Sequence, residues 1–432
     1  MVTSPKPFSI AIIGGGIGGL TLAIGLLKHN VPFTIYESAS QFGEVGAGLG
    51  MSPNGVRAMG LIDHRIKEGF LRCRTNNPHA KMQDVLYTVR VGDFKNANEN
   101  GMIWQKGDRC LRVGDEIFDV PGLPELRGAC HRAHFLDELV RLVPDSVAQF
   151  RKKLVDITET SGDVVLQFAD GTNARHSAVV GCDGIKSRTR ELILGPASKA
   201  TFTGKCAYRG LVPMEKAIEV LGEDEARNSQ LYMGYHGHIL TYPIQLGSTL
   251  NIVAFCSRDS WTNPKWVLPA SQEQVLADYS TWGRKTILTA LENPNVWALF
   301  DHPPARTYCS GRVCLLGDAA HATSPHEGSG AGMVIEDAYI LSSLIGGIGD
   351  AQDLDYAFKA YDEVRRPRMQ KLVTTSRDAG MIYDLELYGD DLEAIEQNVI
   401  HRCDWIWGVD LSAEMERAKG ICIELRGHGK SP

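Results

Sequence analysis

Six residues near the amino terminus, from Gly14 to Gly19, read GGGIGG and contain the spacing GxGxxG. In such a turn the first glycine permits a tight bend, and the second lets the backbone approach a pyrophosphate. The third lets the following helix pack closely on the preceding strand, so these roles fall to Gly14, Gly16 and Gly19. The helix would also present free N–H groups and a positive dipole end to the phosphates. Because glycine-rich turns are common, the flanking sequence must support this interpretation.

A carboxylate and a second glycine-rich segment supply that support. Glu37 follows Gly19 by 18 residues, where a carboxylate accepts hydrogen bonds from ribose hydroxyls and repels a 2′-phosphate. FAD or NAD is therefore favoured over NADP at this site. Asp318 lies in LLGDAAHATSPHEGSGAG, directly after an apolar segment. An aspartate at the end of a strand faces the crevice where open α/β sheets bind ligands. Taken alone, Asp318 could equally be a helix N-cap.

The elements that must position these residues follow from apolar patterns. Residues 8–13 form a short apolar run, residues 18–28 carry apolar side chains at helical spacing, and residues 31–37 form a second run. This β-α-β order predicts an open, doubly wound sheet. The strand pattern returns at residues 312–316, before the second glycine-rich segment and another helix.

The middle of the chain has a different pattern. Its segments are rich in aromatic and β-branched residues and are separated by turn-forming glycines. They comprise residues 205–213, 229–234, 238–244 and 249–257. No helical pattern lies between the last three segments, so we expect an antiparallel sheet. From about residue 354 onward the sequence looks helical and amphipathic.

The amino-acid composition excludes several classes of binding partner. The 432 residues carry 45 basic and 52 acidic side chains, well mixed, with a formal net charge of −7. Nothing resembles the basic stripe that phosphate backbones require, so no nucleic acid is expected. The ten cysteines include no CxxC pair and no histidine has ligand spacing, so we expect reduced thiols in a cytoplasmic protein and no metal. Residues 10–27 are apolar but glycine-rich, which favours strand, turn and helix over a membrane span.

Together the motifs resemble a known family. The glycine turn with Glu37, the segment GCDGIKSRTR at 181–190, and GDAAHATSP at 317–325 occur in the order and spacing of group A flavoprotein aromatic hydroxylases. The resemblance extends from about residue 8 to residue 370 and includes YDEVRRPR at 361–368. Four further segments look closest to fungal salicylate hydroxylase-like enzymes, although related fungal phenol hydroxylases that dearomatise their substrates share them. These segments are GAGLGMSPN (46–54), AYRGLVP (207–213), WALFDHPP (297–304) and DWIWGVDL (404–411).

The resemblance implies a set of cofactor contacts. Glu37 would bind the adenosine ribose, Arg132 would approach the phosphates or the ribityl chain, and Asp318 would bind the ribityl hydroxyls. Pro325 and the loop 328–331 would lie against the isoalloxazine ring. The full expected set is Gly14, Gly16, Gly19, Glu37, Gly50, Arg132, Asp183, Asp318, Pro325, Gly330 and Ala331. The chain departs from many relatives at Ser329 and Met333, which affects contacts at the flavin edge rather than the cofactor itself.

Pattern and resemblance together predict an α/β fold with three parts. The first is a discontinuous Rossmann-like FAD-binding domain, residues 1–200 and 300–350. The second is an inserted antiparallel-sheet substrate domain, residues 201–299, and the third is a helical C-terminal region, residues 351–432. No second GxGxxG turn follows a strand, which agrees with a family that docks NADH or NADPH only transiently.

The substrate site must stabilise an anion and provide a route for a phenol proton, because the oxygen donor of this family attacks electron-rich rings. Arg209 lies in the apolar segment KCAYRGLVP and would be costly to bury without an anion, so we expect it to bind the phenolate or carboxylate. An ion pair at a sheet edge is the alternative. Tyr242 is the expected hydrogen-bond partner of the substrate oxygen, with Tyr208 and His238 as alternatives.

Three other histidines are near the flavin motifs in sequence. His321 is expected to be structural, with its ring bonded to nearby backbone. His302 and His326 could relay protons, although a purely structural role explains both of them better.

The function implied is an FAD-dependent monooxygenase that uses NADH or NADPH and O₂ to hydroxylate a small aromatic acid or phenol through a flavin C4a-hydroperoxide. We expect a salicylate-like hydroxybenzoate, attacked at the carboxylate-bearing carbon with loss of CO₂. Hydroxylative dearomatisation of a resorcinol-type phenol, in secondary metabolism, is the nearest alternative. A flavin reductase or oxidase without oxygenation is the alternative of another class, and it would need an apolar tunnel or a membrane-facing surface. We expect a monomer or homodimer with no membrane partner.

Overall fold

The amino-terminal strand lies inside a six-stranded sheet that is parallel apart from one edge strand. The computed structural model describes residues 4–43, 48–123, 126–283 and 285–429. Both faces of β1 are covered, so its four residues IAII are all apolar and buried. The strand order is β20 (Cys309–Ser310), β21 (Val313–Leu315), β13 (Ala178–Gly181), β1 (Ile10–Ile13), β2 (Phe33–Tyr36) and β9 (Ala148–Gln149).

Two different layers cover the faces of this sheet. Ile10 and Ile12 point towards the helices α1 (Ile17–Lys28) and α10 (Gly330–Gly347), in the largest hydrophobic core. Side chains alternate along a strand, so Ala11 and Ile13 point the other way. There they pack on an antiparallel three-stranded sheet of β10 (Leu154–Glu159), β11 (Val164–Phe168) and β12 (Asn173–His176).

A second, eight-stranded sheet holds the middle segments of the chain. Its core strands β14, β17 and β16 are antiparallel, as the sequence pattern predicts. The strand order is β18 (Val267–Pro269), β19 (Asn295–Asp301), β14 (Thr201–Pro213), β17 (Thr249–Ser257), β16 (Gly237–Ile244), β15 (Gln230–Gly234), β4 (Val85–Val91) and β7 (Glu116–Pro121). One face packs on α6 (Met214–Leu221) and α8 (Gln272–Asp278), and residues of the other face line a large cavity.

Strands β4 and β7 extend this sheet beyond residues 201–299. They come from the stretch expected to belong wholly to the nucleotide domain, and β4 pairs in parallel with β15 through Thr88 and Gln230. No local sequence pattern predicts the pairing of β4 with β15, because the two strands are far apart in sequence.

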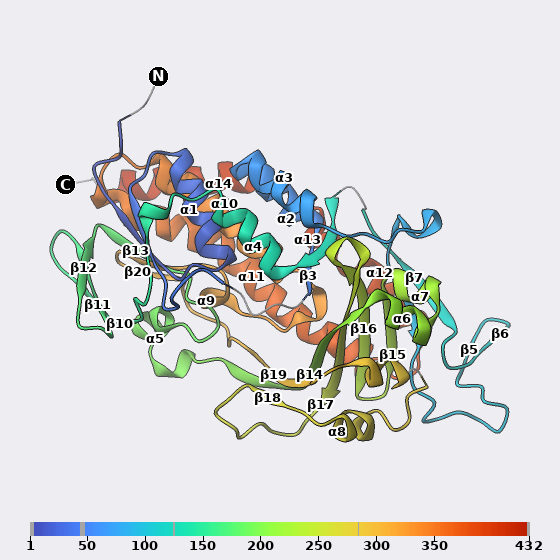
Figure 1. The fold of residues 1–432 in the computed structure, drawn as a ribbon. Coiled ribbons are helices and arrows are strands. Elements are labelled where there is room, and N and C mark those ends of the chain that lie inside the picture. Colours follow the sequence, from blue (N-terminus) through green and yellow to red (C-terminus); the bar gives the residue numbers. More distant parts are fainter. Residues whose placement is uncertain (1–3, 44–47, 124–125, 284, 430–432) are drawn as a thin grey trace.

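The carboxyl-terminal region is helical, as expected. Helix α11 (Leu354–Tyr383) begins in the core beside α10 and reaches the eight-stranded sheet near its carboxyl end, which joins the two halves of the molecule (Figure 1). It is followed by α12 (Leu392–His401), α13 (Asp404–Trp407) and α14 (Leu411–Gly429). Helix α14 lies against α10 and α11, near both chain ends in Figure 1.

The remaining helices and strands are short and connect these layers. They are β3 (Gly48–Met51), α2 (Pro53–Ile62), α3 (His64–Cys73), β5 (Trp104–Lys106), β6 (Arg109–Leu111), β8 (Gly128–His131), α4 (Arg132–Val140), α5 (Arg188–Leu194), α7 (Glu223–Arg227) and α9 (Asp318–His321). Within the described ranges, no helix is both long and apolar enough to cross a membrane.

Candidate active site

One cavity of about 1200 Å³ lies between the two sheets. The glycine turn after β1, the amino-terminal end of α10 and one face of the eight-stranded sheet all contribute to its wall. Small-molecule sites usually measure about 300–1,000 Å³. The space is therefore large enough for an extended nucleotide together with a small second ligand.

The glycine turn has the shape expected of a pyrophosphate cradle. Gly14 has φ +103°, and a Cβ there would collide with the carbonyl oxygen of Cys182. A Cβ at Gly19 would collide with the carbonyl oxygen of Gly14, because α1 crosses β1 at this point. Gly14 and Gly16 line the cavity, whereas Gly19 lies behind the turn. Only glycine fits at the first and third positions. The N–H groups of Gly14 and Gly15 are bonded within the protein, so the N–H groups that a ligand can meet are those at the start of α1.

Glu37 holds this turn in place and also lines the cavity. Its Oε2 accepts a hydrogen bond from the backbone N–H of Gly15 at 2.7 Å, and its Oε1 accepts one from the N–H of Ala39 at 2.7 Å. A carboxylate offers about four lone-pair sites, so it can still accept from a ribose. Its structural bonds to the turn were not apparent from the sequence.

Asp318 is the first residue of α9 and its side chain is exposed to the cavity. Gly317 before it has φ +65°, which bends the chain so that the carboxylate projects from the edge of the sheet. Arg132, the first residue of α4, lines the same cavity. Gly50 of β3 faces the second glycine-rich segment, since a Cβ there would lie 3.8 Å from the carbonyl oxygen of Gly328.

The segment from Pro325 to Ala331 forms one wall of the cavity. Gly328 has the left-handed φ of +59°, which ends a short 3₁₀ turn, and α10 begins at Gly330. The free N–H groups and the positive end of this helix therefore meet the cavity. Ser329 lines the wall as well, whereas Met333 is buried behind it.

Asp183 lines the cavity but its carboxylate has local partners. It accepts a hydrogen bond from the Ser187 hydroxyl at 2.6 Å and one from the N–H of Thr189 at 3.0 Å. Burial raises the pKa of Asp183, and these bonds oppose that effect. The side chain thus shapes the turn before α5, and the neighbouring Gly184 lines the cavity beside it.

These features fit FAD. A cradle that Cβ atoms would block, two helix amino termini and an open carboxylate are the donors and acceptors that a pyrophosphate and a polyhydroxyl chain require. No group of three or more histidine, cysteine or acidic side chains that could hold a metal occurs among the described residues.

The eight-stranded sheet supplies the other wall. Arg209 of β14 lies opposite Val253 of β17, which lies opposite Leu240 of β16, and all three line the cavity. Tyr242, two residues beyond Leu240, points to the same face and also lines it. Tyr208 points the other way and donates a hydrogen bond to Asp278 at 2.6 Å. It therefore cannot contact a ligand in this cavity.

Arg209 is half-buried, and no carboxylate of the described residues pairs with it. Its Nε has no hydrogen-bond partner among the described residues, and its Cζ lies 5.5 Å from the centre of the Trp297 ring. Burial lowers the pKa of Arg209, while Tyr242 acts in the opposite direction. A guanidinium without a carboxylate partner favours an anionic ligand.

Strand β3 fixes the position of the Tyr242 ring. A Cβ at Gly48 would lie 2.6 Å from the Tyr242 hydroxyl, and the Gly48 N–H donates a hydrogen bond to Asn251 at 2.9 Å. Burial raises the pKa of Tyr242 to about 12, against the influence of Arg209. The phenol therefore stays protonated near neutral pH and can donate a hydrogen bond.

Of the four histidines considered from the sequence, the cavity wall contains only His326. His321 is buried outside it, with Nε2 2.5 Å from a carboxylate oxygen of Asp337. His302 is also outside, and burial lowers its pKa to about 3, with Arg190 adding to the effect. His238 lies behind Phe255, with the two rings stacked at 4.2 Å.

Two tyrosines that line the cavity were not identified as site residues from the sequence. The hydroxyls of Tyr87 and Tyr383 lie 2.9 Å apart, and both residues line the cavity. Tyr87 comes from β4 and Tyr383 from the end of α11. Their positions could not be found by local pattern, because β4 was not expected in this sheet.

A largely parallel sheet with a glycine turn at its carboxyl edge faces a mostly antiparallel sheet across one cavity, which is the architecture of a dinucleotide-binding protein with room for a second ligand. Residues 148–376 match the family described as an FAD binding domain. The chain is 39% identical to 6-methylsalicylate 1-monooxygenase atA of Aspergillus terreus, over 98% of this chain and 94% of that protein. It is 36% identical to a salicylate hydroxylase of Pseudomonas putida, over 95% of this chain and 94% of that protein.

A solved structure supports the same relationship. The structure of a salicylate hydroxylase substrate complex superposes with a TM-score of 0.82 at 33% identity, covering 96% of this chain and 98% of that one. The chain belongs to the FAD-dependent aromatic monooxygenases. FAD is its cofactor and NADH or NADPH its co-substrate, as the resemblance to the flavoprotein hydroxylases implied.

Proposed function

We propose that this enzyme hydroxylates a salicylate-like hydroxybenzoate, with Arg209 binding the anionic group and Tyr242 donating a hydrogen bond to a substrate oxygen. The observation that carries the proposal is the buried Nε of Arg209, which has no hydrogen-bond partner among the described residues, beside the protonated phenol of Tyr242. Relatives named for 6-methylsalicylate and salicylate align with 98% and 95% of this chain.

The cofactor contacts proposed from the sequence are supported by their common position. Glycines 14 and 16, Glu37, Arg132, Asp318, Pro325, Gly330 and Ala331 all line the one cavity. We propose that Gly19 acts indirectly, through helix packing, and that Asp183 acts by shaping its turn. Gly50 would leave room for the ring system opposite Gly328.

Bound FAD would accept two electrons from NADH or NADPH and activate O₂. The residues of this chain would orient the substrate ring and stabilise the charges on the substrate and the flavin. Arg209 would hold the carboxylate or phenolate, and Tyr242 would fix the position of the substrate oxygen. The amino terminus of α10 would favour negative charge on the nearest edge of the flavin. The apolar Val253, Leu240 and Phe255 would exclude water from the reacting ring.

The proposed product is a catechol. The balanced reaction takes salicylate, O₂, NADH and two protons to catechol, CO₂, water and NAD⁺. The carboxylate leaves as CO₂ because the new C–O bond forms at the carbon that carries it. Neither the dearomatisation of a resorcinol-type phenol nor flavin chemistry without oxygenation is favoured by the named relatives.

We further propose that residues 1–200 and 300–350 carry FAD and that residues 201–299 bind the substrate, with β4 and β7 added to the substrate sheet. The helical region 351–432 would support both, since α11 contacts both halves. All ten cysteines are free, which supports a cytoplasmic location. A monomer or a homodimer would suffice, because both walls of the cavity come from one chain.

The test is turnover of a panel of phenols by purified enzyme, with NADH or NADPH consumption and product mass measured together. Salicylate and its ring-substituted relatives should couple NAD(P)H oxidation to a catechol that has lost CO₂. A product that keeps the carboxylate and gains one oxygen would contradict the decarboxylation. Coupling only with resorcinol-type phenols would contradict the proposed substrate class.

A further inference from the structure

A series of polar side chains leads away from the cavity at His326. Its Nδ1 lies 3.0 Å from the Ser324 hydroxyl, and its Nε2 has no hydrogen-bond partner among the described residues. The centre of its ring is 5.3 Å from that of His238, so the ring edges are in contact. No hydrogen bond joins the two rings, so a proton would pass between them through one bridging water molecule.

Beyond His238 the series continues through carboxylates and a lysine. His238 Nδ1 lies 2.7 Å from Oδ1 of Asp384, and Lys205 Nζ donates to Oδ2 of Asp384 at 2.6 Å. Lys205 also donates to Glu386 at 2.7 Å. The series therefore joins β16 and β14 to the segment after α11, and the steps from His238 to Glu386 are short hydrogen bonds.

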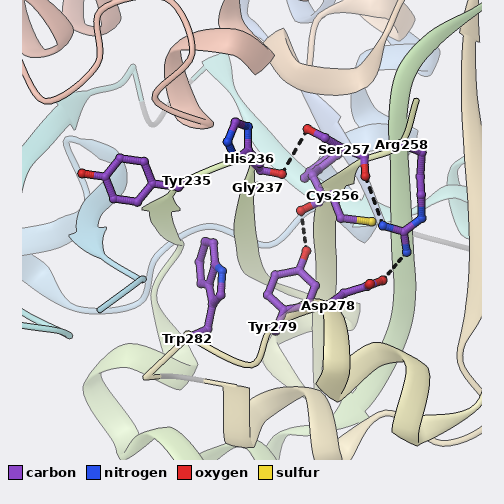
Figure 2. Close-up of a pocket in the computed structure, with 10 residues that line it drawn as sticks. Tyr235, His236, Gly237, Cys256, Ser257, Arg258, Asp278, Tyr279 and Trp282 are labelled. Carbon is purple, nitrogen blue, oxygen red and sulfur yellow. Dashed lines mark hydrogen bonds and ion pairs between the residues drawn. The ribbon is translucent and has the colours of Figure 1, made fainter. Parts of the chain in front are cut away.

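The far end of the series opens to solvent. His236 Nδ1 lies 3.2 Å from Oε1 of Glu386, and the Ser257 hydroxyl donates to the same oxygen at 3.1 Å. His236 and Ser257 line a small polar pocket of about 130 Å³ and lie side by side in Figure 2. Side-chain exposure rises from 0% at Asp384 through 25% at Glu386 to 66% at His236. The series thus has one buried end at the cavity and one solvent end.

The charges along the series are arranged for proton transfer. Burial alone would raise the pKa of Asp384, but His238 and Lys205 outweigh it and hold the carboxylate ionised. Burial, with His238 adding to the effect, lowers the pKa of His326 to about 3, so its ring is neutral. The other titratable groups facing the series are Tyr383, Cys256 and Tyr279. Burial raises the pKa of each, and all three stay protonated.

Hydroxylation needs such a route. The balanced reaction consumes two protons for each hydroxybenzoate that loses CO₂, or one for each ring that is hydroxylated without that loss. A phenol that binds as its anion beside Arg209 must also release its proton. Both transfers connect solvent to a cavity whose substrate wall is buried, where proton movement depends on positioned side chains.

We propose that His326, His238, Asp384 and Lys205 form the proton pathway between the substrate side of the cavity and the surface at His236. The inference rests on the proposed function, because it assumes a phenolic substrate. Asp384 holds His238 with a proton on Nδ1, so Nε2 can accept a proton from the cavity side. As Nε2 gains that proton, Nδ1 gives its own to Asp384. Lys205, already a cation, gives one proton to Glu386 and takes one from Asp384, and Glu386 releases its proton to solvent beside His236. His238 is left with its proton on Nε2, and a turn of its ring restores the first tautomer.

The test compares Asp384→Asn with Asp353→Asn in the FAD-loaded enzyme. Asp353 is a matched control, since it is buried at 6% exposure and paired to Arg426 at 2.7 Å but does not line the cavity. Oxidised enzyme is mixed with salicylate and a pH-indicator dye, without NADH, and proton release is followed by stopped flow. Turnover, KM and the solvent deuterium isotope effect are measured separately, with and without added imidazole.

Asp384→Asn should retain FAD and bind salicylate with unchanged KM. Its proton release and kcat should fall by about tenfold or more, its isotope effect should rise, and imidazole should restore the rate. Asp353→Asn should behave as wild type. Release as fast as wild type in folded, FAD-loaded Asp384→Asn would overturn the pathway, and so would a slow rate that imidazole does not restore.

A surface variant keeps the test decisive if Asp384→Asn does not fold. Glu386→Gln changes a partly exposed residue at the solvent end and should slow proton release severalfold, again with rescue by imidazole. Wild-type rates in Glu386→Gln would then overturn the pathway. A wild-type enzyme that neither releases a proton on binding any phenolic acid nor couples NADH oxidation to it would contradict the proposed function, and the pathway with it.

Discussion

Arg209 and Tyr242 lie on the same face of the eight-stranded sheet, on strands that only β17 separates. Burial lowers the pKa of the guanidinium and raises that of the phenol to about 12. Near neutral pH the pair therefore presents one cation and one neutral donor to the cavity. A hydroxybenzoate, with an anionic group beside a phenolic oxygen, complements this pair.

Replacing Tyr242 by phenylalanine should weaken substrate binding or slow turnover by about tenfold, the cost of one neutral hydrogen bond. The pH dependence distinguishes this role from that of a base. Because the pKa of Tyr242 is about 12, its ionisation should produce no break in the rate between pH 7 and pH 10. Rate profiles for wild type and Tyr242→Phe should share the same shape over this range. A break near pH 9 that is lost in the variant would contradict the protonated state.

The stability of the enzyme should fall as the pH drops below about 6.5, because of its buried histidines. Burial lowers the pKa of His302 to about 3, whereas an unfolded histidine has a pKa of about 6.5. Between these values the unfolded state binds a proton that the folded state does not. The free energy of unfolding then decreases by about 1.4 kcal/mol for each pH unit and each such histidine.

Urea unfolding of FAD-saturated enzyme between pH 7.5 and pH 5 measures this slope. His302→Gln should remove about one proton from the pH dependence. His64→Gln is the matched control, because His64 is 77% exposed, and it should leave the slope unchanged. Equal slopes in wild type and His302→Gln would show that His302 protonates freely in the folded state.

Gly14→Ala should abolish FAD binding. The new Cβ would collide with the Cys182 carbonyl oxygen, and the φ of +103° is unfavourable for any side chain. Gly347→Ala provides the control, because nothing lies within 4 Å of a Cβ there. Flavin absorbance after gel filtration should be lost only in Gly14→Ala. A yellow Gly14→Ala protein would show that the turn can adopt another shape.

Much of the nucleotide half could be predicted from sequence because its signals are local. The run IAII, the glycine turn and Glu37 lie within the first 37 residues, and β1, α1 and β2 appear where the apolar pattern indicates. Strand alternation also shows that Tyr208 and Arg209 point to opposite faces, but sequence alone does not say which face meets the cavity. The packing of α6 and α8 on the Tyr208 face decides this.

The contributions of β4 and the end of α11 could not be predicted. Tyr87 and Asp384 reach their partners through contacts between residues far apart in sequence, and neither lies in a recognisable motif. One signal was available. Lys205 lies in the same apolar strand as Arg209, and a charged residue there indicates a buried partner. The structure identifies that partner as Asp384.

Asp318→Ala should weaken FAD retention by about ten- to a hundredfold, since about 1.5–3 kcal/mol is lost with a charge-assisted hydrogen bond. Its carboxylate is exposed to the cavity, so the change should cost little stability in the absence of FAD. Titration of apoenzyme with FAD, followed by quenching of flavin fluorescence, gives the affinity. An affinity equal to that of wild type would show that this carboxylate is not a ligand.

The most direct test of the account is hydroxylation of a hydroxybenzoate panel by wild type, Arg209→Lys and Arg209→Ala, each checked for bound FAD. Arg209→Ala should keep FAD, because the residue lies in the substrate sheet, and should lose about ten- to a hundredfold in kcat/KM. Lysine should restore only part of this loss, since it lacks the planar fork that matches a carboxylate. Wild-type hydroxylation by FAD-loaded Arg209→Ala would contradict the central claim that the Arg209 guanidinium anchors the substrate.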